Sequence, residues 1–177
     1  MEPRLAVRVA REAVEHILTD LRQAVGCITQ APLTVRQSRR EDAQTFQVAL
    51  GDGRPVALGG SPALSLVVRL RIRLDHNDSG AGWDPRVMAY WFALMDADGR
   101  RELLAYHWHP DGGSSAPFPH LHLGAGVEGL PVTSRVHLPT GHVLLSQVVF
   151  LAISELGVPP LRTNWRRVLM PDTAQMA

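Results

Sequence analysis

Apolar and mostly polar side chains alternate strictly along residues 64–75, and this pattern constrains the fold more than any other part of the sequence. Successive side chains of a β-strand point to opposite faces of the sheet. The alternation therefore predicts a long strand with one buried face. That face consists of Leu64, Leu66, Val68, Leu70, Ile72 and Leu74. Other elements of the chain must cover it.

The two ends of the chain show a helical period instead. Apolar residues recur every three or four positions in 3–24 and again in 143–156, which predicts two amphipathic helices. Gly157 closes the second of them, and a short final helix is predicted over 163–169. These helices are the elements that we expect to pack on the sheet.

Between the helices the sequence favours further strands separated by turns. The segment Asp96-Ala97-Asp98-Gly99-Arg100 lies between two apolar runs, which predicts an antiparallel hairpin. The predicted strands are 33–37, 44–50, 64–75, 87–95, 102–109, 120–123 and 134–138, with longer loops at 75–85 and 110–119. The length of 177 residues fits one domain. We therefore predict a single α+β domain over residues 1–177, an antiparallel sheet of about five to seven strands with an N-terminal and a C-terminal helix packed on it.

The composition excludes several kinds of chemistry. All 18 basic residues are arginine, so the chain holds no lysine nucleophile, Schiff base or P-loop lysine. Cys27 is the single cysteine, which excludes an internal disulfide and a zinc site built from several cysteines. The net charge of +1 gives no strong overall attraction to nucleic acid or anionic lipid. Without an apolar leader or a membrane-length segment, the chain is expected to be cytoplasmic and to have no membrane partner.

The histidines are strongly clustered, with six of the eight between residues 107 and 142. Two His-x-His pairs dominate this segment, and residues two apart on a strand share a face. If the two strands pair across the 110–119 loop, the four rings converge, and at least three should lie close enough to share one ligand. The four are His107, His109, His120 and His122, with His137 and His142 as outer partners. Trp108 should point to the opposite face.

The residues leave four interpretations of these histidines open. Each ring can be a half-buried strand residue satisfied by water or a backbone carbonyl. The four can hold a divalent transition metal such as zinc, because imidazole is a natural ligand for zinc, nickel, copper and iron. They can act without metal on a phosphodiester, one neutral imidazole as base and one protonated imidazole as acid, with an arginine stabilising the charged state. They can also form a pH-sensitive binding surface.

Three arginines lie on one face of the long predicted strand. Arg69, Arg71 and Arg73 alternate with the apolar residues, so their side chains are spaced by roughly 6.6–7 Å. Such a stripe could follow the phosphates of RNA or hold a nucleotide. The alternative is that these arginines form the solvent face of a sheet whose other side is packed by helices, or that they pair with acidic residues of a neighbouring strand.

One short motif resembles a known catalytic signature. His120-Leu121-His122-Leu123-Gly124 is similar to the histidine triad of nucleotide hydrolases, which needs a third alternating histidine where this chain has Gly124. No P-loop, Gly-x-Gly-x-x-Gly or Gly-x-Ser-x-Gly motif is present in the sequence. The sequence therefore carries part of a histidine-based motif and none of the common nucleotide or serine-hydrolase motifs.

A broader resemblance covers residues 86–156. A strand ending in an Asp-Gly turn, a returning strand with Glu-Leu-Leu-Ala-Tyr at 102–106, a histidine-rich segment and a closing helix resemble the TumE-like toxins of bacterial toxin–antitoxin systems. The resemblance implies a small cytoplasmic toxin whose partner is a DNA-binding antitoxin, and it puts the two His-x-His pairs in the equivalent histidine segment. This chain departs from that layout by its longer N-terminal half and by the Pro-Thr-Gly-His segment at 139–142.

Together these observations favour a histidine-dependent ribonuclease or phosphodiesterase of toxin type. A histidine-ligated metal-binding protein or metal-dependent hydrolase is the first alternative, and a binding module without catalysis is the second. The residues do not indicate an oligomeric state.

Overall fold

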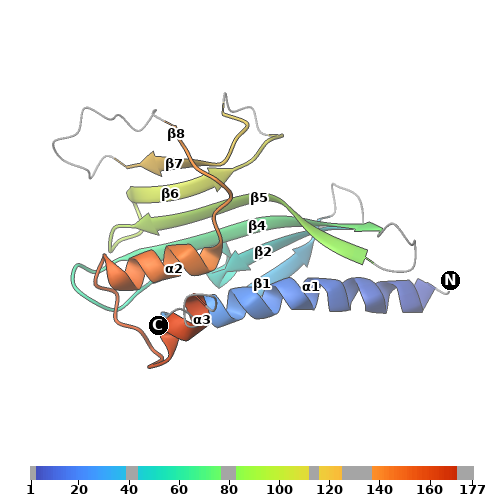
Figure 1. Cartoon of the computed structure of the whole chain (residues 1–177), viewed down its shortest axis with the longest axis horizontal. Helices are drawn as coiled ribbons and strands as arrows, with labels where there is room; N and C mark the ends of the chain where they lie inside the picture. Colours follow the sequence, from blue (N-terminus) through green and yellow to red (C-terminus); the bar gives the residue numbers. More distant parts are fainter. Residues whose placement is uncertain (1–2, 39–43, 77–82, 112–115, 125–136, 171–177) are drawn as a thin grey trace.

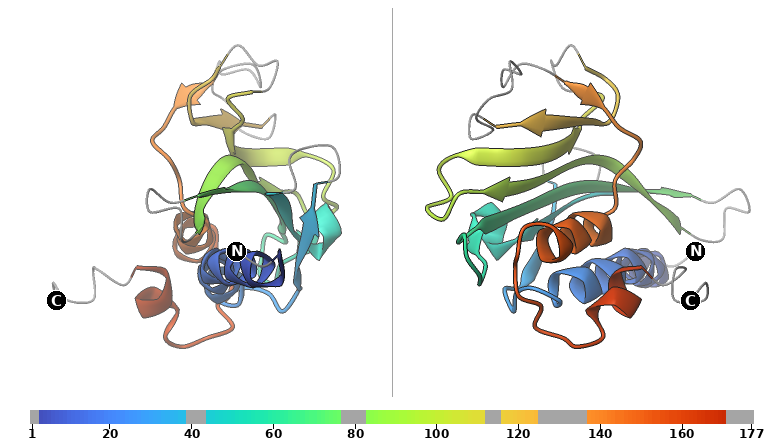
Figure 2. Two further views of the ribbon diagram at one scale, coloured as in Figure 1. Left: turned by 90° about the vertical axis from the view of Figure 1, so that its right-hand side faces the viewer. Right: turned by 60° about the vertical axis from the view of Figure 1, so that its left-hand side comes forward.

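The computed structural model describes residues 3–38, 44–76, 83–111, 116–124 and 137–170. It contains one antiparallel sheet with helices on one side, which confirms the predicted α+β fold (Figures 1 and 2). The strands are β1 Leu33–Gln37, β2 Thr45–Leu50, β3 Val56–Ala57, β4 Ser65–His76, β5 Trp83–Met95, β6 Glu102–Trp108, β7 His120–Leu123 and β8 Leu138–Pro139.

Seven of the strands follow one another across the sheet in the order β1-β2-β4-β5-β6-β7-β8, and β3 pairs with β4 beside this path. Every pair of neighbours is antiparallel. The long strands β4 and β5 form the centre of the sheet, and the histidine-bearing strands β6 and β7 lie on one side of it (Figure 1).

Three helices pack on one face: α1 Pro3–Val25, α2 Leu145–Ser154 and α3 Trp165–Leu169. The sheet curves over α1 (Figure 2, left). A short 3-10 turn, η1 Gly51–Gly53, follows β2. The even-numbered side chains of β4 are buried in the main core with residues of α1 and α2, as the alternation predicted. These β4 residues are Leu66, Val68, Leu70, Ile72 and Leu74.

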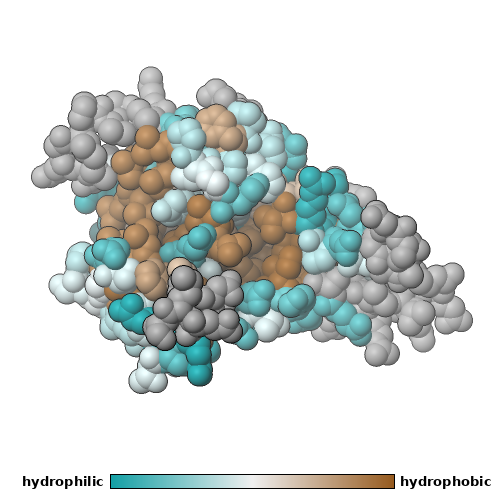
Figure 3. Space-filling view, in the orientation of Figure 1, coloured by the Kyte–Doolittle hydropathy of each residue, from teal (hydrophilic) through white to brown (hydrophobic). Residues whose placement is uncertain are grey.

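The other face of the sheet carries no described helix. A small apolar group of Val67, Ala93, Met95 and Ala105 is buried there, with Trp91 packed against it. On the helix side, apolar residues gather over α2 and the strands directly above it (Figure 3). No helix among the described residues is both long and apolar enough to cross a bilayer. One face of the sheet therefore forms the main core with the helices, and the other carries the small apolar group together with polar side chains.

Some boundaries differ from the prediction. β5 begins at Trp83, so part of the predicted 75–85 loop is strand, because His76 pairs with Trp83 and their rings lie 3.8 Å apart. The strand predicted at 134–138 begins at Leu138, and residues 134–136 lie outside the described part of the chain. Seven strands lie along the path of the sheet, as predicted, and the additional strand β3 is only two residues long and shows no alternation in the sequence.

Candidate metal centre

The hairpin between β5 and β6 sets the position of the first histidine pair. Gly99 adopts a φ of 65°, and the Asp96 carboxylate accepts hydrogen bonds from the backbone N–H groups of Arg100 and Arg101 at 2.8 and 3.1 Å. The Arg101 guanidinium donates a further bond to the same carboxylate at 3.1 Å. This turn fixes the pairing in which Trp91 of β5 lies opposite His107 of β6.

The register between β6 and β7 brings the two His-x-His pairs together. His107 lies directly opposite His120, and Ala105 lies opposite His122. The strands therefore pair across the 110–119 loop as predicted, and these three histidines share the helix-free face. Trp108 has the opposite orientation and packs against the main core.

Five imidazole rings converge on the helix-free face, and we call them the imidazole cluster. The His107 and His122 rings stack with their centroids 4.6 Å apart, and His137 lies 4.7 Å from both His120 and His122. His109 lies 6.0 Å from His120 and 5.9 Å from His107. The cluster consists of His107, His109, His120, His122 and His137.

The cluster offers two sets of three metal ligands. One set is His107, His109 and His120, and the other is His120, His122 and His137; within each set the ligand atoms lie within 4.8 Å of one another. His120 belongs to both sets and is fully buried. It is the centre of the cluster.

A hydrogen bond determines which nitrogen of His120 can bind a metal. Nδ1 lies 2.8 Å from the Phe118 carbonyl oxygen, which can only accept, so Nδ1 carries the hydrogen. Nε2 therefore keeps its lone pair and faces the other rings. Metal-bound histidines commonly have this outer hydrogen bond, which fixes the ring and its tautomer. With Nδ1 committed, His120 can ligate one ion, so the two sets describe alternative sites for a single metal.

Four ring nitrogens in the cluster are buried and have no hydrogen-bond partner among the described residues. They are His107 Nε2, His109 Nδ1, His120 Nε2 and His122 Nε2. A buried polar atom without a partner costs about 1–3 kcal/mol, and folded proteins seldom leave one. One cation held by either ligand set would take up at most three of these nitrogens, whereas the interpretation of separately satisfied strand histidines leaves all four unexplained.

The surroundings keep the central rings neutral. Burial lowers the pKa of His122 to about 4, and the neighbouring imidazoles act in the same direction. Burial also lowers the pKa of His120 below its usual value, although the Phe118 carbonyl acts the opposite way. Neutral imidazole is the form that binds metals.

Glu102 is a cluster neighbour that the sequence reasoning did not identify. Its Oε2 lies 3.7 Å from His107 Nε2 and accepts a hydrogen bond from Trp91 Nε1 at 3.3 Å. Burial raises the pKa of Glu102, but the His107 ring and the Trp91 hydrogen bond outweigh that effect, so the net pKa lies below its usual value. The cluster therefore has an ionised carboxylate beside it.

A β-bulge explains why the alternation of side chains along the strand did not predict that Glu102 lies beside the cluster. Leu94 pairs with Leu104, but the next residue of β5, Met95, pairs with Glu102, so Leu103 is the extra residue. A bulge of this kind turns the following side chain to the other face. The Glu102 side chain therefore lies on the same face of the sheet as His107, although simple alternation places the two on opposite faces.

Gly124 supports this bulge from β7. Its N–H donates a hydrogen bond to the Leu103 carbonyl at 2.8 Å, and a Cβ at this position would overlap the carbonyl group of Glu102. A side chain therefore has no room at position 124. The third histidine of the histidine-triad motif could not be accommodated here.

The two predicted outer partners have different positions. His137 joins the cluster. His142 does not: its ring packs edge-on against Trp108 at 4.3 Å and lies 6.4 Å from Tyr90, two residues that belong to the core side of the sheet. His142 lies apart from the cluster because it precedes α2, which lies on the opposite side of the sheet.

The three stripe arginines all have partners within the chain. Arg69 donates two hydrogen bonds to the Gly53 carbonyl at 2.7 and 3.3 Å, Arg71 pairs with Asp111 at 3.0 Å, and Arg73 pairs with Asp75 at 2.7 Å. These partners lie within the chain, but none of them is an acidic residue of a neighbouring strand, because Gly53 and Asp111 lie in connecting segments and Asp75 lies on β4 itself. Contact with nucleic acid stays a prediction.

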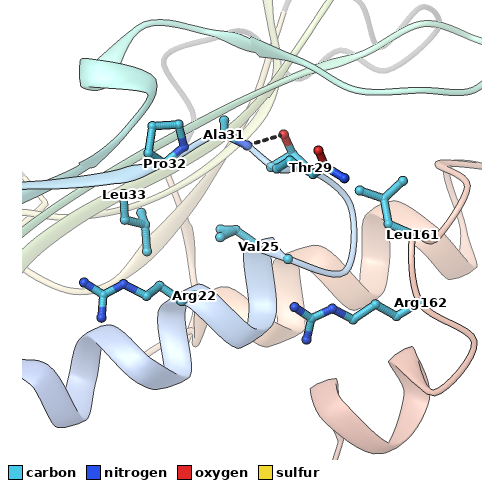
Figure 4. Close-up of a pocket in the computed structure, with 10 residues that line it drawn as sticks. Arg22, Val25, Thr29, Ala31, Pro32, Leu33, Leu161 and Arg162 are labelled. Atoms are coloured by element: carbon cyan, nitrogen blue, oxygen red, sulfur yellow. Dashed lines mark hydrogen bonds between the residues drawn. The ribbon is translucent and has the colours of Figure 1, made fainter.

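A pocket of about 410 Å³ at the end of α1 lies apart from the cluster (Figure 4). Arg22 and Arg162 supply its charged groups, and Arg22 pairs with Glu15 at 2.7 Å. The residues that line it include no histidine, cysteine or carboxylate. It therefore offers no metal ligands, and the imidazole cluster is the better candidate site.

Comparisons of the chain with protein families, with curated proteins and with solved structures found no match. The resemblance to TumE-like toxins accordingly stays a prediction.

Proposed function

We propose that this protein binds a single divalent transition metal ion, such as zinc, through the imidazole cluster, with His120 Nε2 as the central ligand. The observation that carries the proposal is the group of four buried ring nitrogens without hydrogen-bond partners among the described residues, three of them on the residues of one ligand set. Imidazole is a strong ligand for zinc, nickel and copper. Strands β6 and β7 supply His107, His120 and His122, while His109 directly follows β6 and His137 directly precedes β8, so the pairing of these strands sets the positions of the ligands.

The lowered pKa values of His120 and His122 suit metal binding. A metal-free acid–base mechanism needs one imidazole that is protonated near neutral pH. The pKa values of His120 and His122 are lowered, which removes the two central rings from that role. The same neutrality favours metal binding.

The carboxylate of Glu102 gives the proposed centre a means of hydrolysis. A bound zinc ion lowers the pKa of its water to about 7. Glu102 is ionised and lies beside His107, so it can accept a proton there. Hydrolysis of RNA or a nucleotide, a cognate antitoxin and a cytoplasmic location remain predictions, and any such cleavage should be sensitive to EDTA.

Metal analysis of the purified protein tests the proposal. The chain is stripped with EDTA, incubated with zinc, passed through a desalting column and analysed by elemental mass spectrometry. We expect about one ion per chain, and we expect His120→Ala to lose it, because His120 belongs to both ligand sets. His142→Ala is the matched control, because His142 is exposed and lies outside the cluster. Circular dichroism shows whether each variant is folded.

Two outcomes would contradict the proposal. One is that the folded protein retains no zinc, nickel, cobalt or copper. The other is that the folded His120 variant retains as much metal as the His142 variant.

A further inference from the structure

A second pocket lies on the helix-free face, next to the imidazole cluster. Its volume is about 410 Å³, and strands β1, β2, β4 and β5 contribute to its walls. His109 lines this pocket and is also a member of one ligand set. A molecule in the pocket would therefore lie beside a metal bound by His107, His109 and His120.

The pocket is positively charged. Arg36, Arg69 and Arg71 line it, and Asp52 is the acidic residue among its lining. Asp52 pairs with Arg36 at 3.3 Å. Arg71 pairs with Asp111, which does not line the pocket, and Arg69 is bonded to a backbone carbonyl. The arginines that line the pocket therefore outnumber its carboxylates, and an anionic group suits this lining.

Arg69 is held in position before any ligand arrives. Its Nε and Nη2 donate to the Gly53 carbonyl, and its guanidinium lies 4.8 Å from the centre of the Trp91 ring. Gly53 has a φ of 81°, and a Cβ there would lie 3.2 Å from Arg69 Nε. A guanidinium has five N–H donors, of which these bonds use two. A fixed guanidinium with further donors suits oxyanion recognition.

Arg71 can exchange its partner for a ligand. Its ion pair with Asp111 is 3.0 Å long, but the Asp111 side chain is 67% exposed. Exposed ion pairs contribute little, roughly 0–1 kcal/mol. An anion that displaces Asp111 from Arg71 therefore gives up little binding free energy.

We propose that this pocket binds the phosphate group of a small molecule beside the metal, so that the protein acts on a phosphorylated small substrate. The placement beside a metal rests on the proposed function. A pocket of about 410 Å³ falls in the range of roughly 300–1,000 Å³ that is usual for small ligands. Arg73 does not line the pocket. The structure thus favours a small phosphate ligand over a nucleic-acid strand that would follow all three arginines.

Calorimetric titration with inorganic phosphate tests this inference, at constant ionic strength and with both zinc-free and zinc-loaded protein. We expect phosphate to bind both forms and to bind the zinc-loaded form more tightly. Arg71→Gln and Arg69→Gln should each weaken binding by about tenfold or more, because each removes a charge-assisted hydrogen bond. Arg73→Gln is the matched control and should leave the affinity unchanged. All three variants should keep their zinc.

The outcomes separate this inference from the metal proposal. Absence of phosphate binding at millimolar concentration in a protein that holds zinc overturns the inference alone. Phosphate binding that depends on Arg71 in a protein that holds no metal supports the pocket and contradicts the metal proposal. Acetate binding as tight as phosphate binding overturns the assignment to phosphate. An RNA oligonucleotide that binds more tightly than phosphate and is weakened equally by the Arg71 and Arg73 variants overturns the assignment to a small molecule.

Discussion

His107 on β6 lies directly opposite His120 on β7, and their ring centroids are 5.7 Å apart in a stacked arrangement. Two imidazoles in this position would repel each other if both were protonated. Burial and neighbouring rings instead keep the centre of the cluster neutral. The pairing of two short strands thus assembles metal ligands from residues that are 13 positions apart in the chain.

The metal-free protein should lose stability as the pH falls from about 6.5 toward 4. The folded-state pKa of His122 is lowered to about 4, whereas the unfolded chain titrates near 6.5. The unfolded state therefore binds more protons in this window, and each pKa unit is worth about 1.4 kcal/mol. The free energy of unfolding, measured with urea in EDTA, should be lower at pH 4.5 than at pH 7. His122 should contribute at most about 3 kcal/mol to this difference. His122→Phe should flatten the dependence, and an unchanged slope would contradict the burial of a neutral ring.

Replacing Gly124 by alanine should destabilise the protein. The new Cβ would overlap the Glu102 carbonyl, so the bulge must move, and overpacking of this kind costs about 1–3 kcal/mol. The free energy of unfolding measures the effect. Gly141→Ala is the matched control, because a Cβ there meets nothing within 4 Å. Equal stability of the two variants would show that the bulge does not depend on Gly124.

Glu102→Gln should weaken zinc binding while the fold is kept. The amide oxygen can still accept the Trp91 hydrogen bond, but the negative charge beside His107 is lost. Residues that support metal ligands typically contribute about 10–100-fold to affinity. A competition titration with a zinc-binding dye gives the change. Asp98→Asn removes an exposed charge in the hairpin turn and should have no effect, and equal affinity of the two variants would exclude Glu102 from the centre.

Cys27 should be unreactive and unnecessary for metal binding. The thiol is buried, its Sγ donates to the Gln23 carbonyl at 3.4 Å, and burial raises its pKa. We expect iodoacetamide to label it only after unfolding, and Cys27→Ser to retain zinc. Rapid labelling of the native protein would show that this end of α1 opens readily.

The sequence predicted the parts of this site that depend on regular strand geometry. The β6 and β7 segments are regular between residues 104 and 107 and between 120 and 123, so parity correctly placed His107, His120 and His122 on one face. The position of Glu102 depends on a bulge, which alternation does not reveal. The partners of Arg69 and Arg71 lie in connecting segments, where backbone geometry rather than period decides the contact.

The strand β3 was not predicted and the bounds of β8 differ from the prediction for a similar reason. Each is two residues long, which is too few to show a period. The path of the chain between β8 and α2 decides where His142 lies, and that path is set by packing against Trp108 and Tyr90 rather than by a local pattern.

Anomalous diffraction from crystals of the zinc-loaded protein, recorded on both sides of the zinc absorption edge, tests the central claim most directly. The account predicts one strong peak per chain on the helix-free face, about 2.1 Å from His120 Nε2 and bonded to at least two further rings of the imidazole cluster. A peak only at sites without His120, or no peak in crystals whose protein is folded as described, would contradict it.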